Sequence, residues 1–337
     1  MQYKNPKVSI ILPVRNGAAT IGRAVQSIIH QTFENWELLI INDGSTDQTL
    51  SNIEHFQDKR INIIHQKAHG IVTALNLGLK TAKGQYVARM DADDASLPHR
   101  LQMQAALLDA NTNIGVASCL VKHVGNAQQQ QGYALHVAWL NTLRTPQQHL
   151  QNRFVDAPIA HPTAMVRRSV FEQHGGYLHG PFPEDFELWL RFFHHGVQFQ
   201  KVPEVLFHWH DQPQRLSRTN PRYQQAAFYA LKARYFARWF KQQFGQAQPA
   251  LWVCGYGKTV KQRYRHLLDH GLHIAGFVDF KARAVPGQPP VVNYKQLSTL
   301  QNAFILSYVS DRQGRQAIEA HLTKLGYQPG INFLMMA

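Results

Sequence analysis

The sequence predicts an α/β protein with a mainly parallel sheet flanked by helices, followed by a second, smaller α/β domain. Short apolar runs alternate with segments of helical apolar spacing from residue 8 to residue 90, and again beyond residue 250. Such alternation favours parallel strands joined by right-handed crossovers. With 337 residues, of which 44% are hydrophobic, the chain is long enough to bury two cores.

The elements of the first part follow from apolar runs bounded by turn residues. Strands are expected at residues 8–13, 37–41, 61–64 and 85–90, with a further apolar stretch at 114–124 and a strand within 202–209. Helices are expected at residues 18–31, 71–82 and 98–109, and another begins after Pro183. The polar, glutamine-rich residues 126–131 are expected to form a loop.

The charge and composition narrow the possible partners. The formal net charge is +14, and nineteen histidines can add to it. This balance suits nucleic acid, anionic lipid headgroups or phosphorylated substrates, and the lack of zinc-finger spacing ranks nucleic acid last. Cys119 and Cys254 lie in apolar runs, which indicates core thiols in a reducing compartment. The first residues contain no apolar signal core, and no apolar run reaches the length of a membrane span.

Acidic side chains follow two of the expected strands. Asp43 comes after the second strand, and Asp91 and Asp93 come after the fourth. Because parallel strands end at one edge of a sheet, a single ligand could touch all three. Carboxylates two residues apart can share a hard divalent cation, and a cation there implies a phosphate ligand. Asp43 alone has an ordinary explanation as a turn residue, but beside Asp91 and Asp93 we favour ligand binding.

Two further candidates lie later in the chain. Glu184 and Asp185 fall in the first turn of a helix, where the helix dipole favours anions. The alternative is that one of them is a general base, with the dipole and a nearby cation keeping its proton affinity low. His210 directly follows the strand expected within 202–209 and is a candidate metal ligand, with an ordinary core or surface histidine as the equal alternative. Asp94 is expected to cap or fix its loop.

A long basic, aromatic helix is expected at residues 223–244. Its apolar residues follow helical spacing, and lysines and arginines fill the remainder. We favour a linker helix packed on the first domain. The alternative is a surface helix on an anionic membrane.

The last part of the chain has the outline of a dinucleotide-binding βαβ unit. A strand at 251–254 runs into Gly255-Tyr256-Gly257 and a helix, and the next strand ends in Asp279. Val260 stands where the third glycine of the fingerprint would be. A structural or assembly module is therefore favoured over nucleotide or acceptor binding at this turn.

Four motifs in order resemble those of family 2 glycosyltransferases, which have the GT-A fold. They are the segment SIILPVRNGAATIGRAVQSIIHQTFENWELLIINDGSTD, then Asp91-Ala92-Asp93-Asp94, His161-Pro162, and the PEDFELW segment at residues 183–189. The resemblance covers residues 7–211. The tail is similar to small Rossmann-like units appended to sugar-modifying enzymes.

The resemblance implies a nucleotide pocket and a metal site. By position, Pro13, Arg15 and Asp43 belong to the nucleotide pocket, with Asp43 at the uracil, and Arg15 stands where many members carry an aromatic residue. Asp91 is expected against the ribose or the metal. Asp93 is expected to coordinate the cation, Mg²⁺ or Mn²⁺, that bridges the diphosphate.

The resemblance also assigns residues beyond the pocket. Asp185 matches the catalytic base, and His210 falls where some members place a further metal or diphosphate contact. The expected organisation is a GT-A catalytic domain at 1–212, a basic aromatic linker helix at 213–247 and a Rossmann-like accessory domain at 248–337.

The activity implied is inverting, metal-dependent transfer of a sugar from a nucleotide sugar, usually a UDP-sugar, to a hydroxyl of a glycan or lipid-linked acceptor in polysaccharide biosynthesis. The implied location is cytoplasmic, with possible peripheral contact at the inner face of the membrane and no nucleic-acid partner. The alternative is a non-catalytic sugar-nucleotide-binding or scaffold protein. A sugar-phosphate nucleotidyltransferase is disfavoured because a glycine-rich loop does not follow the first strand.

Overall fold

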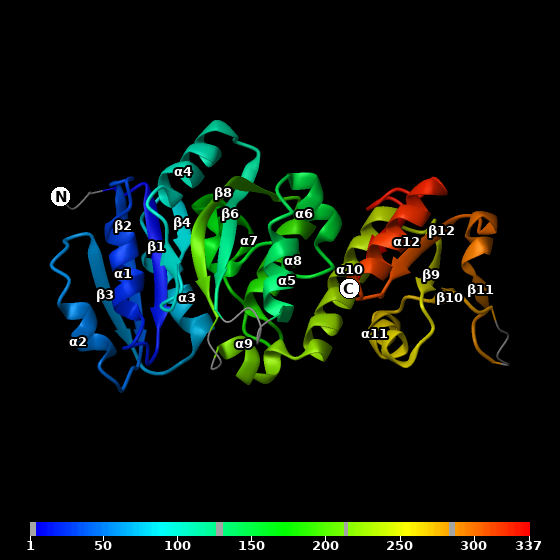
Figure 1. Cartoon of the computed structure of the whole chain (residues 1–337), viewed down its shortest axis with the longest axis horizontal. Helices are drawn as coiled ribbons and strands as arrows, with labels where there is room; N and C mark the ends of the chain where they lie inside the picture. Colours follow the sequence, from blue (N-terminus) through cyan, green and yellow to red (C-terminus); the bar gives the residue numbers. More distant parts are fainter. Residues whose placement is uncertain (1–4, 126–130, 212–214, 283–286) are drawn as a thin grey trace. The chain divides into compact units, whose positions relative to one another are not determined.

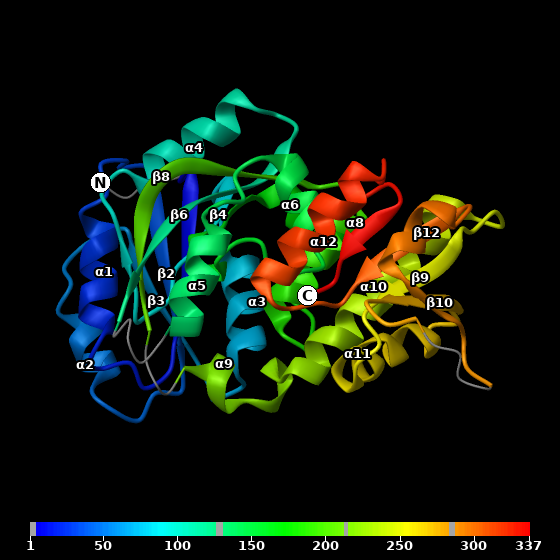
Figure 2. The same cartoon turned by 45° about the vertical axis from the view of Figure 1, so that its right-hand side comes forward.

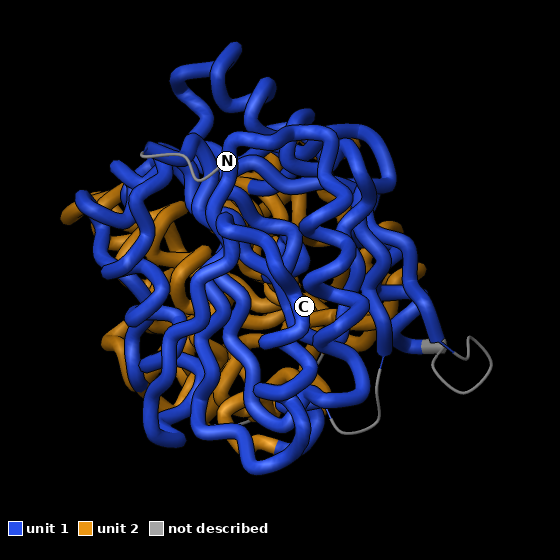
Figure 3. Tube along the Cα trace, turned by 90° about the vertical axis from the view of Figure 1, so that its left-hand side faces the viewer, with its two compact units in different colours: residues 1–149, 158–179, 195–219 blue, residues 150–157, 180–194, 220–337 orange. Residues whose placement is uncertain are grey.

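The computed structural model describes residues 5–125, 131–211, 215–282 and 287–337. It divides into two compact units, coloured separately in Figure 3. The first unit contains residues 1–149, 158–179 and 195–219, and the second contains residues 150–157, 180–194 and 220–337. These units cut across the three expected segments, because residues 180–194 and the helix after residue 224 group with the C-terminal sheet. The boundary expected at 212 and most of the loop expected at 126–131 lie outside the described residues.

An eight-stranded sheet forms the centre of the first unit (Figure 1). Its strands, in sheet order, are β3 (Ile61–Gln66), β2 (Trp36–Asp43), β1 (Val8–Val14), β4 (Tyr86–Arg89), β7 (Met165–Arg167), β6 (Ile114–Val124), β8 (Gln198–His210) and β5 (Ala95–Ser96). The pairs among β1 to β4 and the β6–β8 pair are parallel, whereas β7 and β5 pair antiparallel with their neighbours. The expectation of a mainly parallel sheet is confirmed.

Helices connect these strands and cover the sheet. They are α1 (Ile21–Ile29), α2 (Thr49–Glu54), α3 (Ile71–Thr81), α4 (Arg100–Ala110), α5 (Gln131–Leu140), α6 (Pro146–Asn152), which crosses from the first unit into the second, α7 (Arg168–His174) and α9 (Leu216–Thr219). The short strand β7 was not expected from the sequence, and it fills the gap between β4 and β6.

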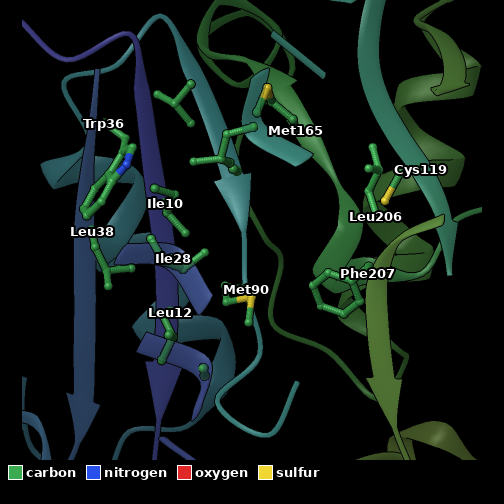
Figure 4. Packing of buried hydrophobic residues seen from close by; sticks show 14 of the residues in the cluster. Ile10, Leu12, Ile28, Trp36, Leu38, Met90, Cys119, Met165, Leu206 and Phe207 are labelled. Atoms are coloured by element: carbon green, nitrogen blue, oxygen red, sulfur yellow. The ribbon is translucent and has the colours of Figure 1, made fainter. Parts of the chain in front are cut away.

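The core of the first unit lies between the sheet and the helices that cover it, among them α1 and α4. Ile10 and Leu12 of β1, Leu38 of β2 and Ile28 of α1 are fully buried and lie together in Figure 4. Alternate residues of a strand point to the same face, so Ile10 and Leu12 meet the helix together. Every residue of β1 and β2 is buried, which is the pattern of strands covered on both faces. The strand ends are therefore where polar side chains reach solvent.

The second unit contains a five-stranded sheet whose described pairs are all parallel, seen with its helices in Figure 2. Its strands, in sheet order, are β11 (Val291–Asn293), β10 (Ile274–Asp279), β9 (Ala250–Cys254), β12 (Ala303–Ser307) and β13 (Phe333–Met335). Its longer helices are α8 (Glu184–His194), α10 (Gln225–Phe244), α11 (Lys258–Leu268) and α12 (Arg312–Lys324). Counted along the chain, the strand order is 3-2-1-4-5, as in doubly wound nucleotide-binding sheets.

Helix α10 is a core element of the second unit. Its buried residues include Leu231, Tyr235, Phe236 and Phe240. Lys232 is also buried, and its Nζ donates hydrogen bonds to the carbonyl oxygens of Val155, at 2.8 Å, and Met336, at 3.1 Å. The aromatic stripe that a membrane-surface helix would need is thus packed inside the protein. Within the described residues, no helix combines the length and apolar character needed to cross a bilayer.

Candidate functional site

A cavity of about 460 Å³ opens in the first unit where β1, β2 and β4 end. The residues that line it include Pro13, Arg15, Asp43, Asp91, Asp93 and Arg215. The first five were candidates from the sequence, and the fold brings them to one cavity because parallel strands end at one edge of the sheet. Arg215 was not predicted.

The carboxylate of Asp43 is held by a neighbouring loop. Its Oδ1 accepts hydrogen bonds from Gln66 Nε2, at 2.6 Å, and from the His69 amide, at 2.9 Å, and its Oδ2 accepts one from the Gly70 amide, at 2.9 Å. The local turn is instead closed by Asn42, whose Oδ1 accepts from the Ser45 amide at 3.1 Å. Asp43 is therefore not an ordinary turn residue: it joins the β2 end to the loop before α3.

Asp91 is paired with the arginine that ends the preceding strand, β4. Arg89 Nη2 lies 2.5 Å from Asp91 Oδ1, and the arginine is buried. Burial by itself would raise the pKa of Asp91, but the Arg89 guanidinium, with His161 and Arg215 nearby, holds that pKa below its usual range. Asp91 is thus kept ionised. Arg89 lies two residues before Asp91, and only its position at the strand end could have indicated this role.

Three carboxylates converge after β4. One oxygen from each of Asp91, Asp93 and Asp94 lies within 4.8 Å of the other two. Burial and the charge of Asp91 raise the pKa values of Asp93 and Asp94. Asp94 is fully buried, and its Oδ2 has no hydrogen-bond partner among the residues that the structure describes. Clustered carboxylates with an unpaired buried oxygen fit a hard divalent cation, whose preferred ligands are oxygens.

His210 lies against this cluster. Its amide donates a 2.7 Å hydrogen bond to Asp94 Oδ1, which fixes the loop as expected for Asp94. The His210 Nδ1 lies 3.9 Å from the same oxygen and, within the described part of the chain, has no hydrogen-bond partner. Burial, together with the Arg23 guanidinium, lowers the pKa of His210. A neutral imidazole can donate a nitrogen lone pair. Among the described residues, however, the side chains close enough to share an ion are Asp91, Asp93 and Asp94, so a metal contact by His210 stays a prediction.

Arg215 adds a positive charge to the acidic cavity. Its guanidinium carbon lies 5.3 Å from the Tyr133 ring centre and 5.0 Å from that of Trp209, and its Nη1 donates to Tyr133 Oη at 2.5 Å. An arginine stacked on two aromatic rings has its guanidinium oriented in advance. The sequence held a weak signal for it, a basic residue shortly after a strand ending in histidine.

Asp185 lies at the start of α8 in the second unit. Its Oδ1 accepts a 2.8 Å hydrogen bond from the Phe186 amide. Burial and the adjacent charge of Glu184, with a contribution from Asp156, raise the pKa of Asp185 to about 7. The expectation of low proton affinity was wrong, because loss of water and neighbouring carboxylates outweigh the helix dipole. A carboxyl with a pKa near neutrality suits general base chemistry better.

Glu184 is committed to other partners. It is 4% exposed, and its Oε1 and Oε2 accept from the Tyr223 hydroxyl at 2.8 and 2.7 Å. Arg222 Nη1 lies 3.7 Å from Oε2. Of the two acidic residues that open α8, Asp185 therefore has the freer carboxylate.

The glycine turn of the second unit is closed by its own residues. Asp279 Oδ2 accepts from the Tyr256 amide at 2.8 Å, and Lys261 Nζ lies 3.8 Å from the centre of the Tyr256 ring. Gly255 adopts a φ of 93°, which explains the glycine without a ligand. A structural or assembly module stays the prediction for this unit.

The fold of the chain is that of GT-A glycosyltransferases. A structure of TarS residues 1–349 from S. aureus with UDP-GlcNAc matches with a TM-score of 0.52 and 18% identity, over 78% of this chain and 80% of that one. An uncharacterised glycosyltransferase of Haemophilus influenzae is 35% identical over 199 residues, 55% of this chain and 59% of that protein. The chain thus spans less than two thirds of this relative.

The family follows from a sequence match and from further relatives. The model of glycosyl transferase family 2 matches residues 9–175. EpsE of Bacillus subtilis, named as a glycosyltransferase, is 32% identical over 60% of this chain and 72% of its own length. An Escherichia coli enzyme, UDP-Glc:alpha-D-GlcNAc-diphosphoundecaprenol beta-1,3-glucosyltransferase WfgD, is 38% identical over 31% of this chain and 42% of its own length. The chain belongs to glycosyl transferase family 2, as its motifs indicated.

Proposed function

We propose that this chain transfers a sugar, with inversion, from a UDP-sugar to a hydroxyl of a glycan or lipid-linked acceptor. The observation that carries the proposal is the cavity at the strand ends, whose lining combines Asp43, Asp91 and Asp93 with Arg15 and Arg215. Its volume, about 460 Å³, lies in the range of small-ligand sites. TarS, which shares the fold, has been solved with UDP-GlcNAc.

Different side chains of the cavity are proposed to bind the uracil, the ribose and the diphosphate of the donor. Asp43 keeps acceptor capacity on Oδ2, which receives one described hydrogen bond, and it can bind the N–H of a uracil. Asp91, kept ionised by Arg89, can accept hydrogen bonds from ribose hydroxyls. Pro13 shapes the wall of the cavity, and Arg15 and Arg215 bring positive charge for a diphosphate.

Asp93, Asp91 and Asp94, with His210, would hold Mg²⁺ or Mn²⁺. When bound, the cation would supply Lewis-acid compensation for the charge of the diphosphate. The chain's own contribution there is a preformed donor set: the carboxylates already converge, and the His210 amide fixes Asp94.

Asp185 is the proposed base. The oxygen of the acceptor hydroxyl bonds to the anomeric carbon while the bond from that carbon to the nucleoside diphosphate breaks. The hydroxyl proton passes to Asp185, whose pKa of about 7 suits this transfer near neutral pH. No covalent nucleophile is needed, since one displacement inverts the anomeric carbon.

The acceptor class is drawn from a relative. WfgD is named for transfer to a GlcNAc diphosphoundecaprenol. We extend this to a glycan or lipid-linked acceptor for the present chain.

The test is metal-dependent release of UDP from a panel of UDP-sugars, with and without a chelator. The parent should release UDP from at least one sugar and stop on chelation. Asp93→Ala should lower the rate at least about 100-fold, the scale of losing one preorganised electrostatic contact. Asp269→Ala is the matched control, because it removes a 71% exposed carboxylate in the second unit. It should release UDP at the parent rate.

Two outcomes would contradict the proposal. Turnover by Asp93→Ala at the parent rate would remove the acidic cluster from the mechanism. Binding of UDP-sugars without any release, even with lipid-linked acceptors present, would favour the alternative of a non-catalytic sugar-nucleotide-binding protein.

A further inference from the structure

One arginine in the wall of the cavity at the strand ends lies against two aromatic rings. Arg215 lines this cavity together with Asp91 and Asp93, and it directly precedes α9. Its guanidinium carbon lies 5.3 Å from the centre of the Tyr133 ring and 5.0 Å from that of the Trp209 ring. Its Nη1 also donates a 2.5 Å hydrogen bond to the Tyr133 hydroxyl oxygen. Two ring contacts and one hydrogen bond together fix the direction of the guanidinium.

Both rings belong to well-packed elements of the first unit. Tyr133 is a residue of α5, and Trp209 is the second-last residue of β8. Their ring centres lie 4.9 Å apart in an edge-to-face arrangement, which aromatic pairs prefer. Trp209 is part of the core of the first unit, and Tyr133 packs against that core. Because packed core side chains keep to one rotamer, the two rings form a fixed support for Arg215.

The positive charge of Arg215 is not used by an ion pair within the described part of the chain. No described carboxylate oxygen lies within 4.0 Å of its nitrogens. Its hydrogen bond to Tyr133 occupies one N–H group, and a guanidinium keeps further donors beside that one. Arg218, three residues later, differs, because its Nη2 lies 2.6 Å from Asp211 Oδ2. An arginine that lines a cavity with donors to spare suits an anion such as a phosphate, whose oxygens can accept two parallel hydrogen bonds.

We propose that Tyr133 is a positioning residue, which holds Arg215 at the diphosphate of the donor so that Arg215 stabilises the leaving group. This inference rests on the proposed function and deepens it. When the bond from the anomeric carbon to the diphosphate oxygen breaks, its electron pair stays on that oxygen, while the acceptor proton passes to Asp185. Arg215 donates hydrogen bonds to the diphosphate oxygens, where this negative charge grows. A guanidinium that is already oriented does not have to reorganise as the charge develops.

The first unit offers a matched control for Tyr133. The Tyr86 hydroxyl also bonds to a charged side chain, donating to Asp109 Oδ1 at 2.7 Å. Tyr86 is the first residue of β4, whereas the cavity lies beyond the last residue of that strand. Tyr86→Phe therefore removes a comparable hydroxyl contact far from the proposed diphosphate site.

The first measurement is a double-mutant cycle on UDP binding, followed by calorimetry in the presence of Mg²⁺. Arg215→Gln should weaken UDP binding by about 10- to 100-fold, the scale of hydrogen bonds to a charged group. Tyr133→Phe should weaken it by about 5-fold, the scale of one hydrogen bond. In protein that already carries Arg215→Gln, Tyr133→Phe should have no further effect, because Tyr133 acts through Arg215. Tyr86→Phe should bind UDP as the parent does.

Two further comparisons separate positioning from a general loss of structure. Uridine has no phosphate, so its binding, followed by NMR titration, should be the same in the parent, Tyr133→Phe and Arg215→Gln. Arg215→Lys keeps the charge but not the planar fork, so it should keep part of the affinity for UDP and no longer respond to Tyr133→Phe. Unchanged UDP affinity in both single variants, equal losses for UDP and uridine, or additive losses in the double variants would overturn the proposal.

Turnover separates this inference from the proposed function. A parent that shows the coupled loss of UDP affinity but transfers no sugar would refute the proposed function, and the assignment of Tyr133 and Arg215 to the diphosphate would stand. A parent that transfers sugar, with Tyr133→Phe and Arg215→Gln equal to it in kcat and in UDP affinity, would refute this inference alone.

Discussion

Two partly buried aspartates of this chain, Asp91 and Asp185, have pKa values shifted in opposite directions. Arg89 at 2.5 Å holds the pKa of Asp91 below its usual range despite burial. Burial, together with the adjacent charge of Glu184, raises the pKa of Asp185 to about 7. Titratable groups whose surroundings push their pKa values apart are typical of sites that need one permanent anion and one proton acceptor.

The raised pKa of Asp185 has a consequence for stability. The folded state holds a proton on Asp185 up to about pH 7, whereas the unfolded chain releases it near the ordinary value of 3.8. The folded state therefore binds more protons between these values, and its stability falls as pH rises through them. Asp185→Asn removes this penalty, so the variant should gain stability over the parent from pH 5 to pH 8, on the order of 2 kcal/mol.

Urea unfolding of the parent and Asp185→Asn at pH 5 and pH 8 measures this difference. Glu187→Gln serves as the control, because it removes a carboxylate that is paired with Arg191 and should destabilise instead. An equal effect of Asp185→Asn at the two pH values would show that the Asp185 carboxyl does not titrate between them.

At the scale of elements, the site depends on how closely α3 approaches β1. The loop that precedes α3 supplies the amides that bind Asp43. Gly78 of α3 faces β1 so closely that a Cβ there would lie 2.5 Å from Ile11 Cγ2. The helix can pack at this distance because position 78 has no side chain.

Two glycine substitutions test this packing. Gly78→Ala should destabilise the protein by about 1 to 3 kcal/mol, because Ile11 must move to admit the methyl group. Gly22→Ala in α1, where nothing lies within 4 Å of the added Cβ, should instead stabilise by about 0.5 kcal/mol through helix propensity. The midpoints of urea unfolding measure both stability changes. A gain of stability in Gly78→Ala would contradict the close approach of α3 to β1.

How well an element could be predicted from the sequence depended on its length. Long periodic elements such as β1 and α3 were located to within a few residues, because their apolar spacing is set by burial. The three-residue strand β7 was missed, since so short a segment has no periodicity and exists only because β4 and β6 leave a place for it. Acidic residues after strand ends were located by pattern. Arg89 and Arg215 were not, because Arg89 lies inside a buried strand and Arg215 is oriented by Tyr133, which is distant in sequence.

At the scale of the whole molecule, the chain combines two units with parallel strands at their centres. The family match ends at residue 175, and Asp185 lies beyond it in the second unit. Helix α10 is part of the core of that unit, with its aromatic residues and Lys232 buried. The second unit thus provides both the proposed base and the residues that surround it, Glu184, Tyr223 and Asp156.

The role of Asp185 as general base is tested most directly by the turnover of Asp185→Asn at saturating UDP-sugar, in the presence of acceptor. Saturation removes differences in donor binding, and the substitution removes the proposed proton acceptor with almost no change in shape. UDP release and sugar transfer should both fall by about 100- to 10,000-fold, the range that general base catalysis contributes. Transfer by Asp185→Asn at the parent rate would contradict the role of Asp185 as base.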